Sequence, residues 1–267
     1  MSFENLTCER NDAIVTVTLN RPAKLNSLSL GLLRDLRNCA EELQRDRDLR
    51  AVLLTGAGRG FCAGADLTDP SSIPGPGQTM GQFMAARLRT EYNVVASLWC
   101  NLPVPLVVAL NGVAAGAGAS LSLTGDITVA ARSASLTFLF APKLGLAPDM
   151  GATHFLARRI GEARARYYAM TGAPIAAETA ERIGLVAECV DDERLMPRAT
   201  ELAQELARAP REALITVRRL MAQACTSSLP EQLELEAAAQ ARLGDSPDFF
   251  EGVAAFREKR APRFGSR

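Results

Sequence analysis

The fold class follows from residues 13–55, which begin with Ala13-Ile-Val-Thr-Val-Thr-Leu19 and end with Ala51-Val-Leu-Leu-Thr55. Both ends are short runs of β-branched and apolar residues, a pattern typical of β-strands. Between them, from Leu28 to Leu49, apolar residues recur at helical spacing, and Ser29 is a suitable N-cap. A strand, a helix and a second strand in this order predict an α/β fold.

The remainder of the chain continues this alternation and then changes. Further strands are expected over Pro105-Leu-Val-Val-Ala-Leu110 and from Asp126 to Ala130, and a helix over about residues 79–101. Long amphipathic helices dominate the sequence that follows. We therefore expect a core over residues 1–195 and a helical C-terminal region over residues 196–267.

Composition and charge exclude several classes of protein. The 267 residues include 30 Lys and Arg against 30 Asp and Glu, so no net charge attracts nucleic acid or an anionic membrane. Hydrophobic residues make up 48% and charged residues 22%, which excludes a disordered chain. No segment has the roughly 18 uninterrupted apolar residues of a membrane-spanning helix. The first residues resemble neither a secretory nor a mitochondrial signal, so we expect a cytoplasmic protein.

The cysteines and the single histidine limit the chemistry further. Six cysteines are far apart in sequence and form no CxxC pair, so we expect reduced, mostly buried thiols. His154 is the only histidine, which excludes a metal site built from several histidines. We expect His154 on a helix surface or in the core.

Two loops of small residues each follow a buried strand: Gly56–Asp66 and Asn111–Ser120. Small residues leave backbone N–H groups accessible, and two such donors aimed at one point form an oxyanion hole. The same residues would also permit close helix packing, and residue type alone leaves both interpretations open. A third loop, Gly145–Gly151, places Asp149 in an apolar turn before a helix, where the carboxylate is either an N-cap or a catalyst.

Four motifs occur in an order typical of one family. They are Asn20-Arg-Pro-Ala-Lys-Leu-Asn26, Gly60-Phe-Cys-Ala-Gly-Ala-Asp-Leu67, Asn111-Gly-Val-Ala-Ala-Gly-Ala-Gly118 and Lys143-Leu-Gly-Leu-Ala-Pro-Asp149. Together they resemble the crotonase superfamily of enoyl-CoA hydratases and isomerases. The last motif is most similar to members with a single catalytic Asp, namely the dienoyl-CoA isomerases and the epoxyphenylacetyl-CoA isomerases.

The resemblance implies an architecture, a substrate class and a set of site residues. It implies a spiral ββα core that binds acyl-CoA, and a helical C-terminal region that forms a homotrimer or a homohexamer. Coenzyme A belongs to the substrate, and neither a further cofactor nor a metal is expected. The amides of Ala65 and Ala117 correspond to the oxyanion hole. The residues that correspond to CoA contacts are Arg21, Lys24, Leu25, Ala63, Asp66 and Leu67, together with Phe256 and Lys259, which in this family often come from a neighbouring subunit.

Three departures from the family pattern bear on the chemistry. Ala117 stands where glycine is more usual, which is tolerated if its φ is negative. Ser120 and Ala141 stand where the hydratases carry their two glutamates, and neither side chain can act as an acid. Asp149 remains as the candidate acid, and burial among apolar neighbours would have to raise its pKa toward neutral pH for it to act as a base.

These features favour an enoyl-CoA isomerase in which Asp149 moves a proton and thereby shifts a double bond. Hydration of a 2-enoyl-CoA, with Asp149 and Ser120 holding water, is one alternative. A hydrolase or dehalogenase with Asp149 as nucleophile is a second, and a non-catalytic subunit that binds CoA esters is a third. The sequence leaves the acyl chain open, and His154, Tyr92 and Trp99 are either neighbours of the acyl pocket or ordinary packing residues.

Overall fold

Pairs of strands repeat along the computed structural model, which describes residues 3–265. The first strand of each pair joins a six-stranded sheet and the second joins a four-stranded sheet. In spatial order the larger sheet consists of β1 (Leu6–Asn11), β2 (Ile14–Leu19), β3 (Ala51–Gly56), β5 (Leu106–Leu110), β7 (Ile127–Ala131) and β10 (Glu188–Val190). The smaller sheet consists of β4 (Gly60–Cys62), β6 (Val113–Ala115), β8 (Ser135–Thr137) and β9 (Ile175–Ala176).

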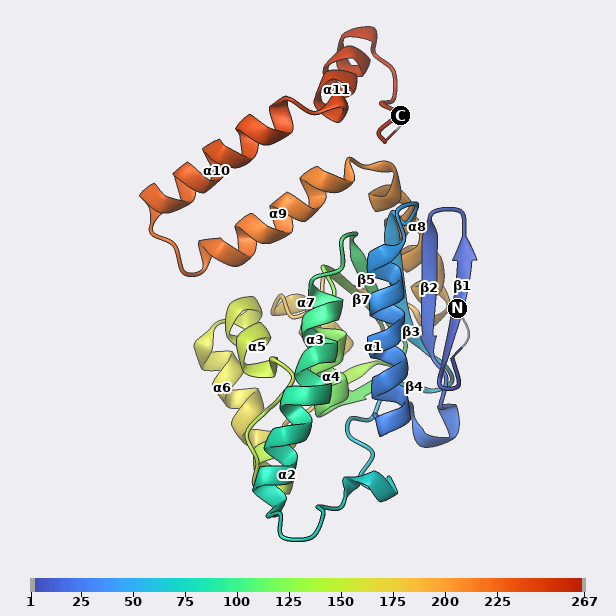
Figure 1. The fold of residues 1–267 in the computed structure, drawn as a ribbon, viewed down its shortest axis with the longest axis vertical. Coiled ribbons are helices and arrows are strands. Elements are labelled where there is room, and N and C mark those ends of the chain that lie inside the picture. Colours follow the sequence, from blue (N-terminus) through green and yellow to red (C-terminus); the bar gives the residue numbers. More distant parts are fainter. Residues whose placement is uncertain (1–2, 266–267) are drawn as a thin grey trace.

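The three pairs β3–β4, β5–β6 and β7–β8 are successive turns of a spiral, with helices after each turn (Figure 1). Strands β2, β3, β5, β7 and β10 are parallel neighbours, as are β4, β6 and β8. Gly60 pairs with Val113 and Val113 pairs with Ser135, so equivalent points of each turn lie side by side. The predicted α/β class and the crotonase-type spiral are confirmed.

The helices begin and end at residues with clear local causes. Ser29 caps α1, as expected, because its hydroxyl accepts a hydrogen bond from the Leu32 amide. Thr79 and Gln82 form a capping box that starts α2. The helices are α1 (Leu30–Arg45), α2 (Met80–Arg87), α3 (Asn93–Cys100), α4 (Ala117–Ser122), α5 (Ala152–Ile160), α6 (Glu162–Thr171), α7 (Ala177–Arg182), α8 (Leu195–Arg208), α9 (Arg211–Ala224), α10 (Leu229–Gly244) and α11 (Pro247–Glu258).

The predicted helix over about residues 79–101 is present as α2 and α3, joined by a π-helical turn over Leu88–Tyr92. The predicted helix over residues 28–49 is shorter, because Asp46 adopts an extended conformation and ends α1 at Arg45. Strands β4, β6 and β8 were not predicted, since three residues are too few to show a period of two.

The helical region expected from residue 196 has two parts in the structure. Helix α8 packs against β3, β5 and β7 and contributes Ala199 and Leu202 to the core. Helices α9, α10 and α11 project beyond the body at one end of its long axis (Figure 1). Arg218 of α9 fastens them to the core by an ion pair with Asp126 and a hydrogen bond of 2.8 Å to the Val104 carbonyl.

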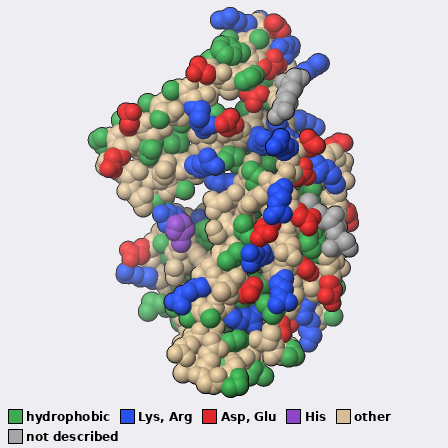
Figure 2. Space-filling view, viewed as in Figure 1, with side chains coloured by type: hydrophobic (Ala, Val, Ile, Leu, Met, Phe, Trp, Pro, Cys, Tyr) green, Lys and Arg blue, Asp and Glu red, His purple; other side chains and the backbone are tan. Residues whose placement is uncertain are grey.

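Between them, α9, α10 and α11 enclose an apolar groove of about 1060 Å³. Large hydrophobic side chains are exposed on these helices, among them Met221, Leu233, Phe249, Phe250 and Phe256. Figure 2 shows hydrophobic side chains scattered over the C-terminal helices at the top of the molecule. Such a surface on a helical projection requires a covering partner or costs solvation free energy.

Candidate active site

Three loops meet at the beginning of α4, because glycines allow their backbones to touch. A Cβ on Gly118 would lie 2.2 Å from the Cys62 carbonyl oxygen, so only glycine fits where α4 crosses the end of β4. A Cβ on Gly64, whose φ is +93°, would lie 2.7 Å from the Ala115 oxygen and 3.5 Å from the Ala117 nitrogen. The two loops of small residues identified in the sequence are therefore in direct contact.

The backbone amides of Ala65 and Ala117 are both free to bind an oxygen atom. Leu28 pairs with the neighbours of Ala65: its N–H donates to Gly64 over 2.7 Å, and its carbonyl accepts from Asp66 over 3.1 Å. The Ala65 N–H, on the other edge of the backbone, has no acceptor within residues 3–265, and neither has the Ala117 N–H at the first position of α4. Ala117 is not among the residues with positive φ, so alanine is tolerated there.

Asp149 lies against α4 at Ser120 and is half-buried, and one of its carboxylate oxygens is an orphan. The Ser120 hydroxyl of α4 donates to the Asp149 carbonyl over 3.0 Å and fixes this loop against the helix. Met150 and Gly151 follow with φ of 48° and 81°, a tight turn that leads into α5. The Oδ1 atom of Asp149 is buried and has no hydrogen-bond partner in the described part of the chain.

Burial raises the pKa of Asp149 to about 6, and a hydrogen bond from its own backbone N–H opposes the shift only in part. A carboxylate with no cation beside it is costly to bury, so its proton is held more tightly than in water. A group with a pKa near neutral can both take and return a proton. Asp149 is therefore not a helix cap, since α5 has no side-chain cap, and its carboxyl group exchanges its proton near neutral pH.

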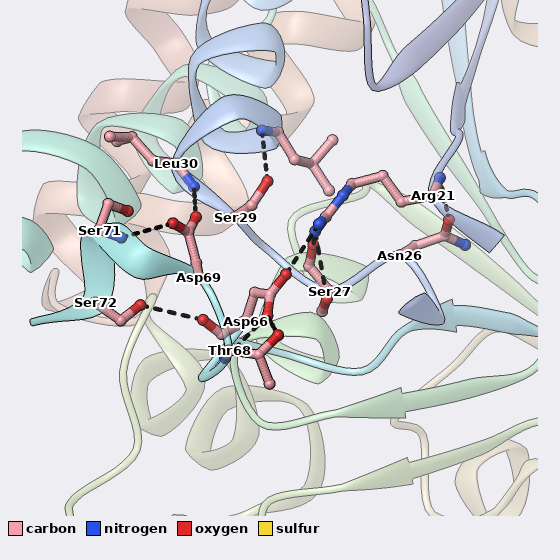
Figure 3. Close-up of polar contacts among 11 residues, drawn as sticks. Arg21, Asn26, Ser27, Ser29, Leu30, Asp66, Thr68, Asp69, Ser71 and Ser72 are labelled. Atoms are coloured by element: carbon pink, nitrogen blue, oxygen red, sulfur yellow. Dashed lines mark hydrogen bonds and ion pairs between the residues drawn. The ribbon is translucent and has the colours of Figure 1, made fainter. Parts of the chain in front are cut away.

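Arg21 and Asp66 form an ion pair of 2.9 Å at the outer end of the site (Figure 3). Arg21 also donates to the Ser27 carbonyl, and Thr68 donates to Asp66 through its hydroxyl over 2.7 Å. Burial alone would raise the pKa of Asp66, but the hydrogen bonds from Thr68 and Arg21 outweigh it and hold that pKa below its usual range. Asp66 is thus a fixed anion that orders the loop.

Several predicted CoA contacts surround this ion pair. Arg21, Lys24 and Asp66 line a surface pocket of about 460 Å³ together with Arg34 and Asp69. Leu25, which follows Lys24 in the chain, adopts a φ of 48°, and its carbonyl accepts a hydrogen bond of 2.9 Å from the Ala63 amide, although neither residue lines the pocket itself. Leu67 is 72% exposed next to Asp66. The structure thus brings together the six predicted contacts of the N-terminal part.

Phe256 and Lys259 are not brought to this pocket within one chain. Phe256 lines the groove of the C-terminal helices and is 85% exposed, and Lys259 ends α11 with a φ of 54°. In Figure 1, α11 is at the top of the molecule, whereas β4 is in the lower half of the body. A role for these two residues at a CoA site would need a second copy of the chain.

Residues 9–267 match the family model described as enoyl-CoA hydratase/isomerase. The chain belongs to the enoyl-CoA hydratase/isomerase family. It is 44% identical over 252 residues to the 1,2-epoxyphenylacetyl-CoA isomerase of Escherichia coli K12, with 94% of each chain covered. It is 39% identical over 268 residues to a protein named "Probable enoyl-CoA hydratase" from Rhodobacter capsulatus, with both chains fully covered.

Solved structures agree with the family and with the fold. The chain superimposes on the enoyl-CoA hydratase of Bacillus anthracis with a TM-score of 0.90 at 33% identity, covering 99% of this chain and 100% of that one. The relatives carry both isomerase and hydratase names, so the residues of the site have to decide between the two reactions.

Ser120 and Ala141, which stand where the resemblance to hydratases predicts glutamates, differ in their surroundings. Ser120 is fully buried, and its hydroxyl lies 3.0 Å from the Asp149 carbonyl oxygen and 3.3 Å from that of Gly116. Ala141 is exposed in the turn before the Asp149 loop. Neither position supplies an acid within the family fold, and Ser120 instead holds the Asp149 loop in place.

Trp99, Tyr92 and His154, which the sequence left as either pocket or packing residues, lie in three different environments. Trp99 is a packing residue, since it is fully buried and its indole N–H donates to the Leu36 carbonyl over 3.1 Å. Tyr92 lies near Asp149. Burial is the main cause that raises the pKa of the Tyr92 hydroxyl to about 12, and the negative charge of Asp149 adds to the increase. His154 is exposed on α5, and its Nδ1 contacts Arg158 at 2.6 Å.

Sequence reasoning missed the side chains that hold the loops together. Asn26, whose φ is 55°, donates to the carbonyls of Ala57 and Gly60 and accepts from the Arg21 amide. Asn111 similarly accepts from the Gly56 amide. Both residues belong to the quoted motifs, and an Asn in a glycine-rich turn is a recognisable signal for such bridging.

Within residues 3–265, no group of three or more His, Cys, Asp or Glu side chains is arranged to hold a metal ion. In the same range, no helix is long and apolar enough to cross a membrane.

Gly118→Ala tests whether the contact between the loops builds the site. The new methyl group would overlap the Cys62 carbonyl, so we expect a loss of unfolding free energy of about 2–3 kcal/mol and a strong loss of turnover. Gly81→Ala in α2 is the matched control, because a Cβ there meets nothing within 4 Å. Urea unfolding and CoA-ester turnover measure both effects. Equal stability of the two variants would show that the contact is not required.

Proposed function

We propose that the protein is an enoyl-CoA isomerase in which Asp149 moves a proton along the acyl chain. The observation that carries this proposal is the orphaned, buried Oδ1 of Asp149, in a loop that Ser120 holds against α4, the helix whose first residue carries the free Ala117 amide. Two other carboxylates of the site, the buried Asp66 and the half-buried Asp69, are fully engaged with Arg21, Thr68, Leu30 and Ser71.

The proposed reaction begins with a CoA thioester whose carbonyl oxygen accepts hydrogen bonds from the Ala65 and Ala117 amides. The Asp149 carboxylate removes a proton from the carbon beside the thioester of a 3-enoyl-CoA, and the electron pair moves onto the carbonyl oxygen. The two amides stabilise the resulting enolate. The protonated Asp149 then returns the proton to the fourth carbon, and a 2-enoyl-CoA forms. One group therefore serves as base and then as acid.

The ionisation of Asp149 fits this double role. With a pKa of about 6, most of the enzyme carries the carboxylate at pH 7, and the carboxylic acid formed during the reaction is still a competent donor. An exposed Asp with a pKa of about 3.9 would be a much weaker base. The site needs no further titratable group, since one proton is removed and the same proton is returned.

Hydration is the second candidate, because relatives at 39% and 32% identity carry hydratase names. Hydration requires a water held and activated by acids, and Ser120 and Ala141 provide none. A pure CoA-ester-binding subunit is disfavoured by Asp149, since a buried carboxylate without a partner costs binding and stability. Hydrolysis through a covalent Asp149 intermediate stays a further alternative, which mass analysis of the protein during turnover would reveal.

The proposed function also concerns the oligomeric state, the cofactor requirement and the cellular location of the enzyme. The apolar groove of α9, α10 and α11 supports a homotrimer or homohexamer, in which Phe256 and Lys259 would reach the CoA site of a neighbouring copy. We propose that CoA enters as part of the substrate and that the reaction uses no other cofactor. A cytoplasmic location stays a prediction from the sequence.

Asp149→Asn tests the role of the carboxylate. We expect turnover of a 3-enoyl-CoA to fall by about 1000-fold or more, because the amide cannot accept the proton. Binding of a CoA ester should change by less than about threefold, since Asp149 is not among the residues that line the pocket of the predicted CoA contacts. Asp245→Asn, at an exposed position, is the matched control. Near-normal turnover by Asp149→Asn would contradict the proposal.

The pH dependence of the reaction tests the ionisation of Asp149. Because burial raises its pKa to about 6, the active carboxylate is present above that pH and is lost as the pH falls through it. We expect kcat/KM to be level from about pH 7 to 8 and to decrease about tenfold for each pH unit below about 5.5. His154→Gln should keep this profile, which separates Asp149 from the only histidine. A rate independent of pH between 5 and 8 would exclude Asp149 as the base.

A further inference from the structure

Two cysteines from different elements face each other on the side of the core remote from Asp149. Cys8 is in the edge strand β1, and Cys39 is in α1, 31 residues later. Their Sγ atoms are 3.8 Å apart, within contact distance. Cys39 is fully buried and Cys8 is half-buried, so the pair lies at the border between core and solvent.

Polar contacts on both sides hold the two sulfurs in place. The backbone and side-chain N–H groups of Asn5 each donate to Asp35 over 2.9 Å, one helical turn before Cys39. Beyond the cysteines, Arg10 forms an ion pair with Asp46, the residue that ends α1. Strand β1 is thus attached to α1 before and after the sulfur pair.

The two thiols differ in reactivity. A hydrogen bond from Cys39 lowers the pKa of the Cys8 thiol, although burial opposes the shift, while the same contact and burial raise the pKa of Cys39. A lower pKa provides more of the nucleophilic thiolate. Burial raises the pKa of Cys62 to about 12 and that of Cys100 to about 11, so both stay protonated. Cys8 is therefore the buried or half-buried cysteine most open to oxidation.

We propose that Cys8 and Cys39 are a site of oxidative modification, where exposure to a peroxide forms an intramolecular disulfide. The Cys8 thiolate attacks one peroxide oxygen, the O–O bond breaks, and a sulfenic acid and hydroxide result. The Cys39 sulfur then attacks Cys8, the S–O bond breaks, and hydroxide leaves and takes the Cys39 proton to form water. In total, two thiols and one hydrogen peroxide give one disulfide and two waters.

The geometry requires only a small movement. The sulfurs must approach from 3.8 Å to about 2.05 Å, a distance that side-chain rotation can cover when the backbones are already neighbours. The bond would close a loop that contains Arg21, Lys24 and Asn26, and it would fasten β1 to α1 covalently. Such a closure restricts the unfolded chain, so we expect a higher Tm for the oxidised protein.

Peptide mapping of the full protein tests the disulfide directly. Trypsin cleavage after Arg10, Arg37 and Arg45 gives peptides 1–10 and 38–45, each with a single cysteine. After treatment with hydrogen peroxide, and without reductant, we expect these two peptides joined, lighter by two hydrogen atoms than their sum. Reductant should release both. Two separate peptides, with free or individually oxidised cysteines, would overturn the proposal.

Two variants complete the test. Cys8→Ser should abolish the joined peptide and the rise in Tm on oxidation, whereas Cys225→Ser, which removes the exposed cysteine, should keep both. Loss of the joined peptide in Cys225→Ser would mean that it arises between molecules or by exchange, and would overturn the intramolecular pairing. Peptide mapping of the protein without substitutions decides the question even if Cys8→Ser folds poorly.

Discussion

The site depends on the contact between the loop after β4 and the loop that leads into α4. Glycines make this contact possible, because a Cβ at Gly112 or Gly118 would lie 2.2 Å from the carbonyl oxygen of Arg59 or Cys62. The spiral brings equivalent points of its turns side by side, and without side chains there the backbones can touch. The contact places the amides of Ala65 and Ala117 in one region, and α4 then provides Ser120 to hold the Asp149 loop. Backbone packing therefore brings the two amides of the proposed oxyanion hole into one region before any side chain takes part.

Two aspartates of the site show how partners decide ionisation. Asp66 accepts hydrogen bonds from Arg21 and Thr68, which hold its pKa below the usual range in spite of burial. Within residues 3–265, Asp149 has neither a cation nor a side-chain donor beside it, and burial raises its pKa to about 6. The same side chain therefore serves as a permanent anion in one loop and as a candidate base in the other. Ser120 and Ala141 stand where the resemblance to hydratases predicts glutamates, which leaves Asp149 as the proposed acid and favours proton transfer over the activation of water.

Much of this arrangement could be predicted from the sequence, because local patterns and ordered motifs carry it. The strand Ala51–Gly56, the helix capped by Ser29 and the two loops of small residues are local features, and the structure has them. The short strands β4, β6 and β8 form because they pair with neighbouring strands. Three residues are too few to show the alternation that predicts a strand from sequence. Contacts between distant residues were also missed. Arg21 and Asp66 were predicted as separate CoA contacts, yet they pair with each other. Cys8 and Cys39 are far apart in sequence, and no motif indicated that their sulfurs lie 3.8 Å apart.

In the proposed reaction one carboxylate moves a proton, and no water is added to the substrate. Incubation of the purified protein with a 3-enoyl-CoA in water enriched in heavy oxygen, followed by mass analysis of the products, tests this mechanism most directly. An isomerase gives a 2-enoyl-CoA of unchanged mass, in which the double bond has moved and no label has entered. A labelled 3-hydroxyacyl-CoA as the main product would contradict this mechanism, since water would then be activated without the glutamates at positions 120 and 141.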